Sequence, residues 1–156
     1  MDRYQRQDEK DRPEIVFSMT GETMFDWNTP ESFDTHRLAG DIDAAGKRSD
    51  APSVLLVEGL MVLHAEEVRA KLNLGIFVEL EADERVLRRM LRNMSPERGS
   101  QAPHFIAGYY RQSARVGHAR FVEPSRVHAD LIVRGDADFD RIAPMIAAMV
   151  KAMHGY

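Results

Sequence analysis

No cysteine occurs in the 156-residue chain, which excludes disulfide bonds, thiolate nucleophiles and cysteine-based zinc sites. Long apolar runs are missing as well. The longest, such as 54–57 and 131–133, fall far short of the ~20 residues that a membrane-spanning helix needs. The charged N-terminal stretch lacks the apolar segment of a secretory signal. These absences predict a cytoplasmic protein with no membrane partner.

Lysine is scarce, and positive charge is not in excess. The formal net charge is −4, so we expect no nucleic-acid partner. Only four of the 21 basic residues are lysines, and nine arginines fall between Arg85 and Arg126. The planar guanidinium suits bidentate contacts with phosphate or carboxylate. A bias of the genome toward G and C, combined with a solvent-exposed helix face, would also explain the arginines. Composition does not decide between this explanation and contacts with phosphate or carboxylate.

The length and the 44% hydrophobic content predict one globular domain over 1–156. Hydrophobic periodicity predicts an irregular hairpin in 14–27, strands at 53–57, 75–80 and 129–133, and helices at 33–45, 64–72, 83–94, 104–120 and 139–153. This alternation predicts an α/β fold, with a largely parallel sheet covered by helices on both faces. Ligands of such sheets bind at the carboxyl ends of the strands. That rule singles out 58–59, 80–83 and 134–136.

The run Val54–Gly59 places Glu58 at the tip of an apolar, β-branched stretch. A carboxylate in that position can hold magnesium, directly or through water, beside nucleotide phosphates. The alternative is a carboxylate that caps the next helix. A strand that ends in Glu-Gly is common, so the motif alone does not decide between them.

Four arginines, Arg85, Arg88, Arg89 and Arg92, recur at helical spacing and share one helix face. Such a row can stabilise charge on a transferring phosphoryl group. Arg98 follows in a loop with a glycine, which is typical of a mobile lid. The alternative is a solvated face whose arginines pair with neighbouring acidic residues.

Other candidate chemistry is weak. The six histidines show no metal-ligand spacing, and we predict that all six are non-catalytic. The serines lack the context of a nucleophile elbow.

The order of these motifs resembles the uridine kinase and phosphoribulokinase family. Within 54–93 the chain has a strand ending in E-G, the strand L-G-I-F-V and then D-x-R-x-x-R-R-x-x-R. The run 120–135 resembles the family's next strand and its approach. The stretch 25–34 is similar to the family's F-D-H-P-D-A-F-D, and 1–4 is similar to its D-x-Y/F. No single motif is specific, but the ordered set covers nearly the whole chain.

The resemblance implies a P-loop NTPase-like fold that uses ATP and Mg²⁺. Asp2 would take the proton from the acceptor hydroxyl, and Glu58 would hold magnesium. Arg89 and Arg92 would lie against the phosphates and the acceptor, and Arg98 would sit in the lid.

Further site residues also follow from the resemblance. The loop Arg134, Gly135 and Asp136 would lie near the adenine of the nucleotide. Tyr4, Asp26 and Asn28 would contact the acceptor.

The chain departs from the family in several ways. The phosphate loop G-x-x-x-x-G-K-[ST] precedes the family's aspartate and is found nowhere in this sequence. We therefore expect the C-terminal portion of such a kinase, without the first strand–P-loop–helix unit and inactive by itself. A truncated start, a natural remnant and a split enzyme all fit. Asn28 replaces an acidic residue, Gly108 replaces a base-contacting glutamine, and a base-framing Y-D-F-x-T-H segment is missing.

The predicted activity is transfer of the ATP γ-phosphoryl group to a hydroxyl of a nucleoside or similar small molecule. One alternative is a non-catalytic nucleotide-binding or regulatory remnant of the kinase fold. Another is a kinase for a different acceptor, such as a sugar phosphate or a pantothenate-like compound. Assembly into a homo-oligomer is left open.

Overall fold

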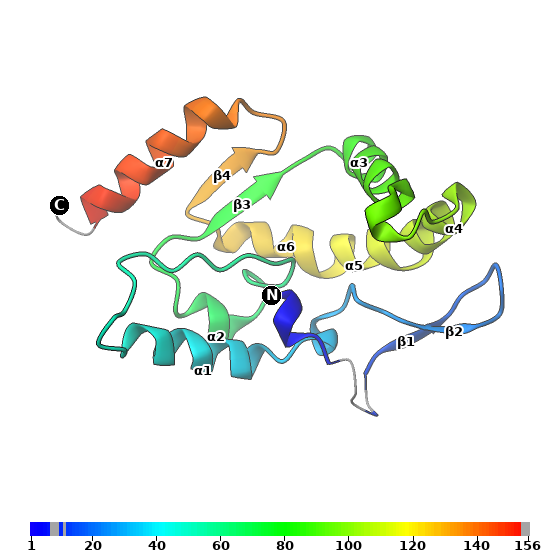
Figure 1. Cartoon of the computed structure of the whole chain (residues 1–156), viewed down its shortest axis with the longest axis horizontal. Coiled ribbons are helices and arrows are strands. Elements are labelled where there is room, and N and C mark those ends of the chain that lie inside the picture. Colours follow the sequence, from blue (N-terminus) through cyan, green and yellow to red (C-terminus); the bar gives the residue numbers. More distant parts are fainter. Residues whose placement is uncertain (7–9, 11, 154–156) are drawn as a thin grey trace.

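The computed structural model describes residues 1–6, 10 and 12–153 (Figure 1). The strands are β1 (Glu14–Val16), β2 (Thr23–Phe25), β3 (Ile76–Glu79) and β4 (Leu131–Arg134). The α-helices are α1 (Thr35–Gly46), α2 (Glu66–Arg69), α3 (Ala82–Met94), α4 (Pro103–Tyr109), α5 (Arg115–Gly117), α6 (Glu123–Ser125) and α7 (Phe139–Met153). The 3₁₀ turns are η1 (Asp2–Tyr4), η2 (Pro30–Ser32), η3 (Pro96–Arg98) and η6 (Arg126–His128), and the π-helical segments are η4 (Tyr110–Ala114) and η5 (His118–Val122).

The parallel pair β3–β4 lies at the middle of the molecule (Figure 1). Ile76 pairs with Leu131 and Glu79 with Arg134, so both strands end at the same edge. All of α3 to α6 lies between these strands in the chain, as a parallel crossover requires. The α/β class and the parallel pairing predicted from the sequence are confirmed.

The predicted buried strand at 53–57 is wrong, because this stretch forms no strand. Leu56 is 86% exposed, and Val54 and Leu55 are also exposed. A strand needs a partner for its backbone N–H and C=O groups, and no described segment pairs with 53–57. The expected cover on both faces of the sheet is also incomplete, because Val78 and Ile132 stay largely exposed.

The hydrophobic core lies where the N-terminal turn meets α1 and the segment 61–68. Its buried members are Met1, Phe33, Leu38, Ala39, Met61, Val62, Ala65 and Val68. The side chain of Asp34 caps α1 by accepting from the backbone N–H of Arg37 at 2.9 Å. Helix α2 is shorter than the helix predicted over 64–72. This core fixes η1 beside the loop 58–60, which positions Asp2.

The predicted hairpin at 14–27 is confirmed as the antiparallel pair β1–β2. Phe17 at its turn is fully buried and packs edge-on against Phe105 of α4, with ring centroids 5.0 Å apart. A side chain at Gly108 would overlap with Met19 and Phe17. Glycine at position 108 therefore makes room for the hairpin, which accounts physically for the lost glutamine.

One nearly continuous helical run extends from α4 to α6, in the place predicted for the helix at 104–120. Two π-helical segments, η4 and η5, interrupt it. Helix α3 agrees with its prediction, and α7 agrees in position but buries no residue. Among the described residues, no helix is both long and apolar enough to traverse a bilayer.

Gly117→Ala is predicted to destabilise the fold by about 1–3 kcal/mol, because the new methyl group would overlap the backbone of Asn28. Urea denaturation measures the change. Gly40→Ala is the matched control, since position 40 lies in α1 with open space around it and should gain about 0.5–1 kcal/mol. Equal stability of the Gly117 variant and the wild type would contradict the close packing of loop 26–28.

Candidate functional site

Two adjoining cavities border the loop 26–28 and α3. The first also borders the N-terminal turn and α4, and the second borders η4, α5 and η5. The first has a volume of about 440 Å³ and the second about 290 Å³. Asn28, Leu60 and Arg89 line both of them. Volumes in this range suit small-molecule ligands.

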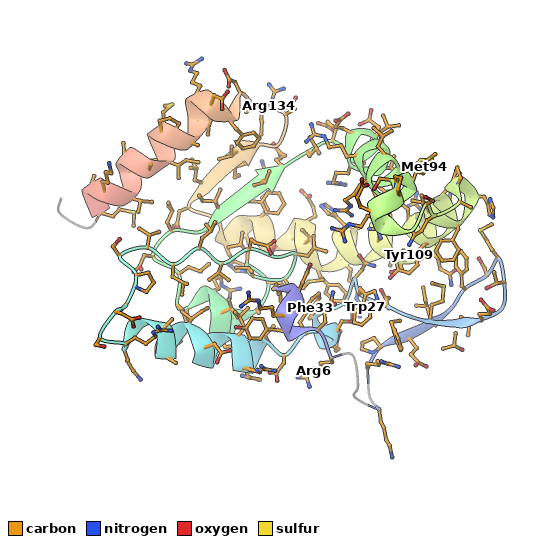
Figure 2. The ribbon with its side chains drawn as sticks, viewed as in Figure 1. Arg6, Trp27, Phe33, Met94, Tyr109 and Arg134 are labelled. Atoms are coloured by element: carbon orange, nitrogen blue, oxygen red, sulfur yellow. The ribbon has the colours of Figure 1, made fainter. Side chains whose placement is uncertain are left out.

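The first cavity has a mixed wall, in which five of the fifteen lining residues are aromatic and six are polar or charged. Its lining residues are Met1, Asp2, Gln5, Met24, Phe25, Trp27, Asn28, Phe33, Leu60, Arg89, Asn93, Gln101, Phe105, Ile106 and Tyr109. Figure 2 shows Trp27 and Phe33 close to the N-terminal turn, with Tyr109 nearby on α4. Flat aromatic surfaces combined with polar groups favour a planar, partly polar ligand.

The second cavity collects the arginine row of α3. Arg85, Arg88, Arg89 and Arg92 all line it, as their spacing predicts for one helix face. Two of them are tied to protein groups. Arg88 pairs with Glu84 at 2.6 Å and donates to the carbonyl oxygen of Gly135 at 3.0 Å. Arg85 donates to the carbonyl oxygen of Leu80 at 2.9 Å. The alternative hypothesis, a solvent-exposed helix face whose arginines all pair with neighbouring acidic residues, therefore holds for only part of the row.

Arg89 has no carboxylate partner among the described residues. It is half-buried, and its Nε has no hydrogen-bond partner among the described residues. Its guanidinium lies 5.5 Å from the centroid of the Tyr109 ring. Burial lowers the pKa of Arg89, and the neighbouring charge of Arg92 lowers it further, but an arginine keeps its proton. A desolvated guanidinium between two cavities is well placed to receive an anionic or strongly polar ligand group.

Asp2 and Glu58 lie on neighbouring segments. Asp2 lines the first cavity. The Met1 ammonium group donates to the Glu58 carbonyl oxygen at 2.8 Å and lies 3.5 Å from its carboxylate. Gly59, with φ of 154°, leaves room for the Met1 side chain. The Glu58 carboxylate is 80% exposed and lines neither cavity.

The chain offers few ligands for a metal ion. Within residues 1–6, 10 and 12–153, no three histidine or acidic side chains are grouped so that they could hold a metal. Mg²⁺ accepts one or two carboxylates when water and substrate phosphates complete its octahedron. Glu58 fits that role as a single ligand only.

Some predicted site residues lie outside both cavities. The hydroxyl of Tyr4 donates to Asp41 at 3.0 Å. Arg98 is exposed in η3, and Asp26 lines neither cavity. Arg134 and Asp136 pair with each other at 2.7 Å, and Figure 2 shows Arg134 away from Trp27 and Tyr109. The hydrogen bond from Arg88 to Gly135 connects this loop to the second cavity.

A buried polar network anchors the loop 26–28 to the helical run. The Asn28 Nδ2 donates to the Tyr109 hydroxyl at 3.3 Å and to the Ser113 hydroxyl at 2.6 Å. Ser113 donates to Asp26 Oδ1 at 2.6 Å, and Tyr109 donates to the Phe25 carbonyl oxygen at 3.1 Å. Tyr109 and Ser113 were not singled out in the sequence, although the spacing of Tyr109, Ser113 and Gly117 puts them on one face of a helix.

His118 also lines the second cavity, where the sequence predicted no role for a histidine. Its Nε2 lies 3.0 Å from Nη1 of Arg85, so it accepts from that guanidinium only when the ring is neutral. Burial lowers the pKa of His118 from 6.5, Arg85 lowers it further, and Glu123 opposes both effects. Nothing in the sequence shows this contact, because the two residues lie 33 positions apart. His154 lies outside the described residues.

The stability of the fold is predicted to decrease as the pH falls below about 6.5. The lowered pKa means that the unfolded state takes up a proton on His118 before the folded state does, so acid favours unfolding. Above pH 6.5 the neutral His118 contributes fully to the stability of the fold. This contribution is lost as the pH falls toward the lower pKa that His118 has in the folded state. Urea denaturation from pH 8 to pH 5 measures the slope, which His118→Gln should reduce. His104→Gln, a change at an exposed histidine, is the control. An unchanged slope in His118→Gln would contradict the assignment.

Comparison with known proteins identifies the family of the chain. The model of the phosphoribulokinase / uridine kinase family matches residues 26–140. A uridine kinase of Chlamydia pneumoniae is 32% identical over 147 residues, covering 80% of this chain and 65% of that protein. A uridine kinase of Deinococcus deserti is 29% identical over 163 residues, covering 91% and 77%. The chain therefore spans less than two thirds of the first relative's length. Because the family model matches most of the chain, the protein belongs to the phosphoribulokinase / uridine kinase family.

Proposed function

We propose that this chain carries the acceptor-binding part of an enzyme that transfers the γ-phosphoryl group of ATP to a hydroxyl of a nucleoside or similar small molecule. One observation carries the proposal. A carboxylate, Asp2, and a partner-poor guanidinium, Arg89, line the same cavity, and that cavity adjoins one lined by four arginines. Transfer of a phosphoryl group requires that the acceptor hydroxyl and the phosphate be bound in neighbouring sites.

Each residue has a definite task in this proposal. Asp2 accepts the proton of the attacking hydroxyl, as a carboxylate within reach of the acceptor can. Arg89 lies at the junction of the two cavities and stabilises negative charge as the phosphoryl group moves between them. Arg92 adds a second guanidinium, with no carboxylate partner among the described residues, on the phosphate side. Arg98 would join from the lid, and Arg134 with Asp136 would border the nucleotide.

The phosphate-binding loop that this chemistry requires would come from a segment outside this sequence. The exposed apolar side chains of Val54, Leu55 and Leu56 support that view, because this apolar stretch forms no strand by itself and would become one if an added segment paired with it. Magnesium would supply further neutralisation of the phosphate charge, with Glu58 as one of its ligands. By itself the chain is then expected to bind an acceptor without turning it over.

The relatives are named uridine kinases, and the wall of the first cavity supports a base-bearing acceptor. Phe25, Trp27 and Phe105 present flat apolar surfaces of the kind on which a heterocycle packs. The loss of the family's base-framing segment leaves room for a different acceptor, such as a sugar phosphate, whose phosphate Arg89 would attract.

Purified 1–156 is predicted to bind uridine saturably at one site per chain and to form no uridine monophosphate with ATP and Mg²⁺. Isothermal titration calorimetry measures the binding, and separation of the nucleosides by chromatography measures turnover. Ribose is the control ligand, because it keeps the hydroxyls and lacks the base that the aromatic walls contact. Ordinary turnover would contradict the need for an external phosphate loop. Ribose binding as tight as uridine binding would contradict the base-binding wall.

Arg89→Met is predicted to weaken uridine binding at least about tenfold while leaving stability equal to that of the wild type or up to about 1 kcal/mol higher. A partly desolvated guanidinium without an ionic partner destabilises the free protein, whereas in the complex it can contact a polar group of the ligand. Arg115→Met is the matched control, since Arg115 is exposed and lies outside both cavities. Calorimetry and urea denaturation give the two quantities. A large loss of stability with unchanged binding would show that Arg89 is structural.

A further inference from the structure

His118 lies in a cavity that is strongly cationic. The second cavity is lined by His118, by Tyr110 and by the four arginines of α3, and none of its lining residues is an aspartate or a glutamate. Guanidinium groups and phenols keep their charge state around neutral pH. Among the residues that line this cavity, only His118 therefore has a side chain whose charge changes between about pH 5 and pH 8.

The guanidinium of Arg85 connects this histidine to the backbone at the end of β3. Nη1 of Arg85 donates to the carbonyl oxygen of Leu80 at 2.9 Å and lies 3.0 Å from Nε2 of His118. Nη1 has two protons, so both are used when Nε2 accepts one of them. In that arrangement the imidazole is neutral and carries its own proton on Nδ1.

Protonation of His118 changes the nature of this contact. Once Nε2 carries a proton, Nε2 and Nη1 of Arg85 are both donors, and their positive charges repel each other. An oxygen atom of an anion that lies between the two donors can accept from both. The hydrogen bond to Leu80 still holds the guanidinium, so the contact between Arg85 and His118 is the one that is exchanged.

The charges around His118 favour the neutral ring in the free protein. Burial lowers the pKa of His118, Arg85 lowers it further, and Glu123, which follows η5, raises it. The three other arginines of α3 line the same cavity and add to its positive potential. A bound anion opposes that potential, so it favours the imidazolium over the neutral imidazole.

We propose that His118 is a binding residue of the second cavity, and that it takes up a proton from the solvent when a tetrahedral oxyanion, such as a phosphate group, binds there. The imidazolium donates to the anion through Nε2, beside Arg85. The inference rests on the phosphate side of the proposed function and deepens it, because it adds a cation that is charged only in the complex. A cation of this kind does not carry the cost of an unpaired buried charge in the free protein.

The coupling between proton and anion has a definite sign. Because the bound anion raises the pKa of His118, a lower pH must raise the affinity for the anion by the same coupling. The affinity is expected to increase as the pH falls through the pKa of the complex, and to level off below the pKa of the free protein.

Nitrogen NMR of the histidine rings in the 1–156 chain tests the proposal with sulfate, which keeps its charge over the titration from pH 8 to pH 5. The pKa of His118 is expected to lie below 6.5 without sulfate and to rise past 6.5 with sulfate at constant ionic strength. The ring of His104, which is exposed and lines neither cavity, is the internal control and should titrate equally in both. A second titration with ATP distinguishes a nucleotide phosphate from a free oxyanion. A pKa of His118 that neither ligand raises overturns the proposal.

Calorimetry measures the same coupling as affinity. The wild type is expected to bind sulfate about fivefold more tightly at pH 5.5 than at pH 7.5, and to take up a proton that buffers of different ionisation heat detect. His118→Gln should abolish both effects, because the glutamine oxygen accepts from Arg85 but the side chain gains no charge. His104→Gln is the matched control and should keep both. A pH dependence that survives in His118→Gln would overturn the role of His118.

The outcomes separate this inference from the proposed function. If Arg92→Met weakens sulfate binding while sulfate leaves His118 neutral, the second cavity remains a phosphate site and the role of His118 is overturned. If neither sulfate nor ATP binds, the phosphate side of the proposed function is overturned together with this inference. Uridine binding to the first cavity is measured independently in either case.

Discussion

The contact between the loop 26–28 and Gly117 is the constraint on which the site depends. The carbonyl oxygen of Asn28 lies where a side chain at position 117 would begin. Only with that space free can Asn28 reach Tyr109 and Ser113 and close the buried network. Interiors pack to high density, so one absent methyl group decides whether two backbones can touch. The loop in turn forms part of the wall between the two cavities. The close packing at Gly117 therefore also constrains the space that a ligand can occupy.

The arginines of the site differ in how far neighbouring protein groups compensate their charge. Arg85 and Arg88 are held by carbonyl oxygens at the ends of the sheet region and by Glu84, so their charge is partly compensated by the protein. Arg89 has no such partner in the part of the chain that the structure describes, and the desolvation that lowers its pKa is the same cost that a bound anion would relieve. The Tyr109 ring lies 5.5 Å from this guanidinium, and an apolar neighbour strengthens any electrostatic interaction that a ligand makes with the cation.

Local patterns predicted much of the fold and part of the site. The arginine row was predictable because helical periodicity is a local property, and α3 presents all four side chains to one cavity. The strand predicted at 53–57 failed because an apolar run becomes a strand only when another segment pairs with it. His118 and Ser113 were missed for a related reason. Their partners, Arg85 and Asp26, are distant in the sequence, and no spacing rule connects them.

The hairpin explains why a departure from the family pattern need not mean loss of the acceptor site. Gly108 lacks the glutamine side chain expected there, but the space is filled by Phe17 and Met19 of the hairpin turn. The same hairpin brings Met24 and Phe25 to the wall of the first cavity. The polar contact that the family has from this helix is thereby exchanged for apolar surface from the hairpin, and the polar groups of the cavity come from other positions, such as Asp2, Asn93 and Gln101. Under the proposed function, an acceptor in this cavity would be recognised more by apolar contact with the hairpin than by an amide contact from α4.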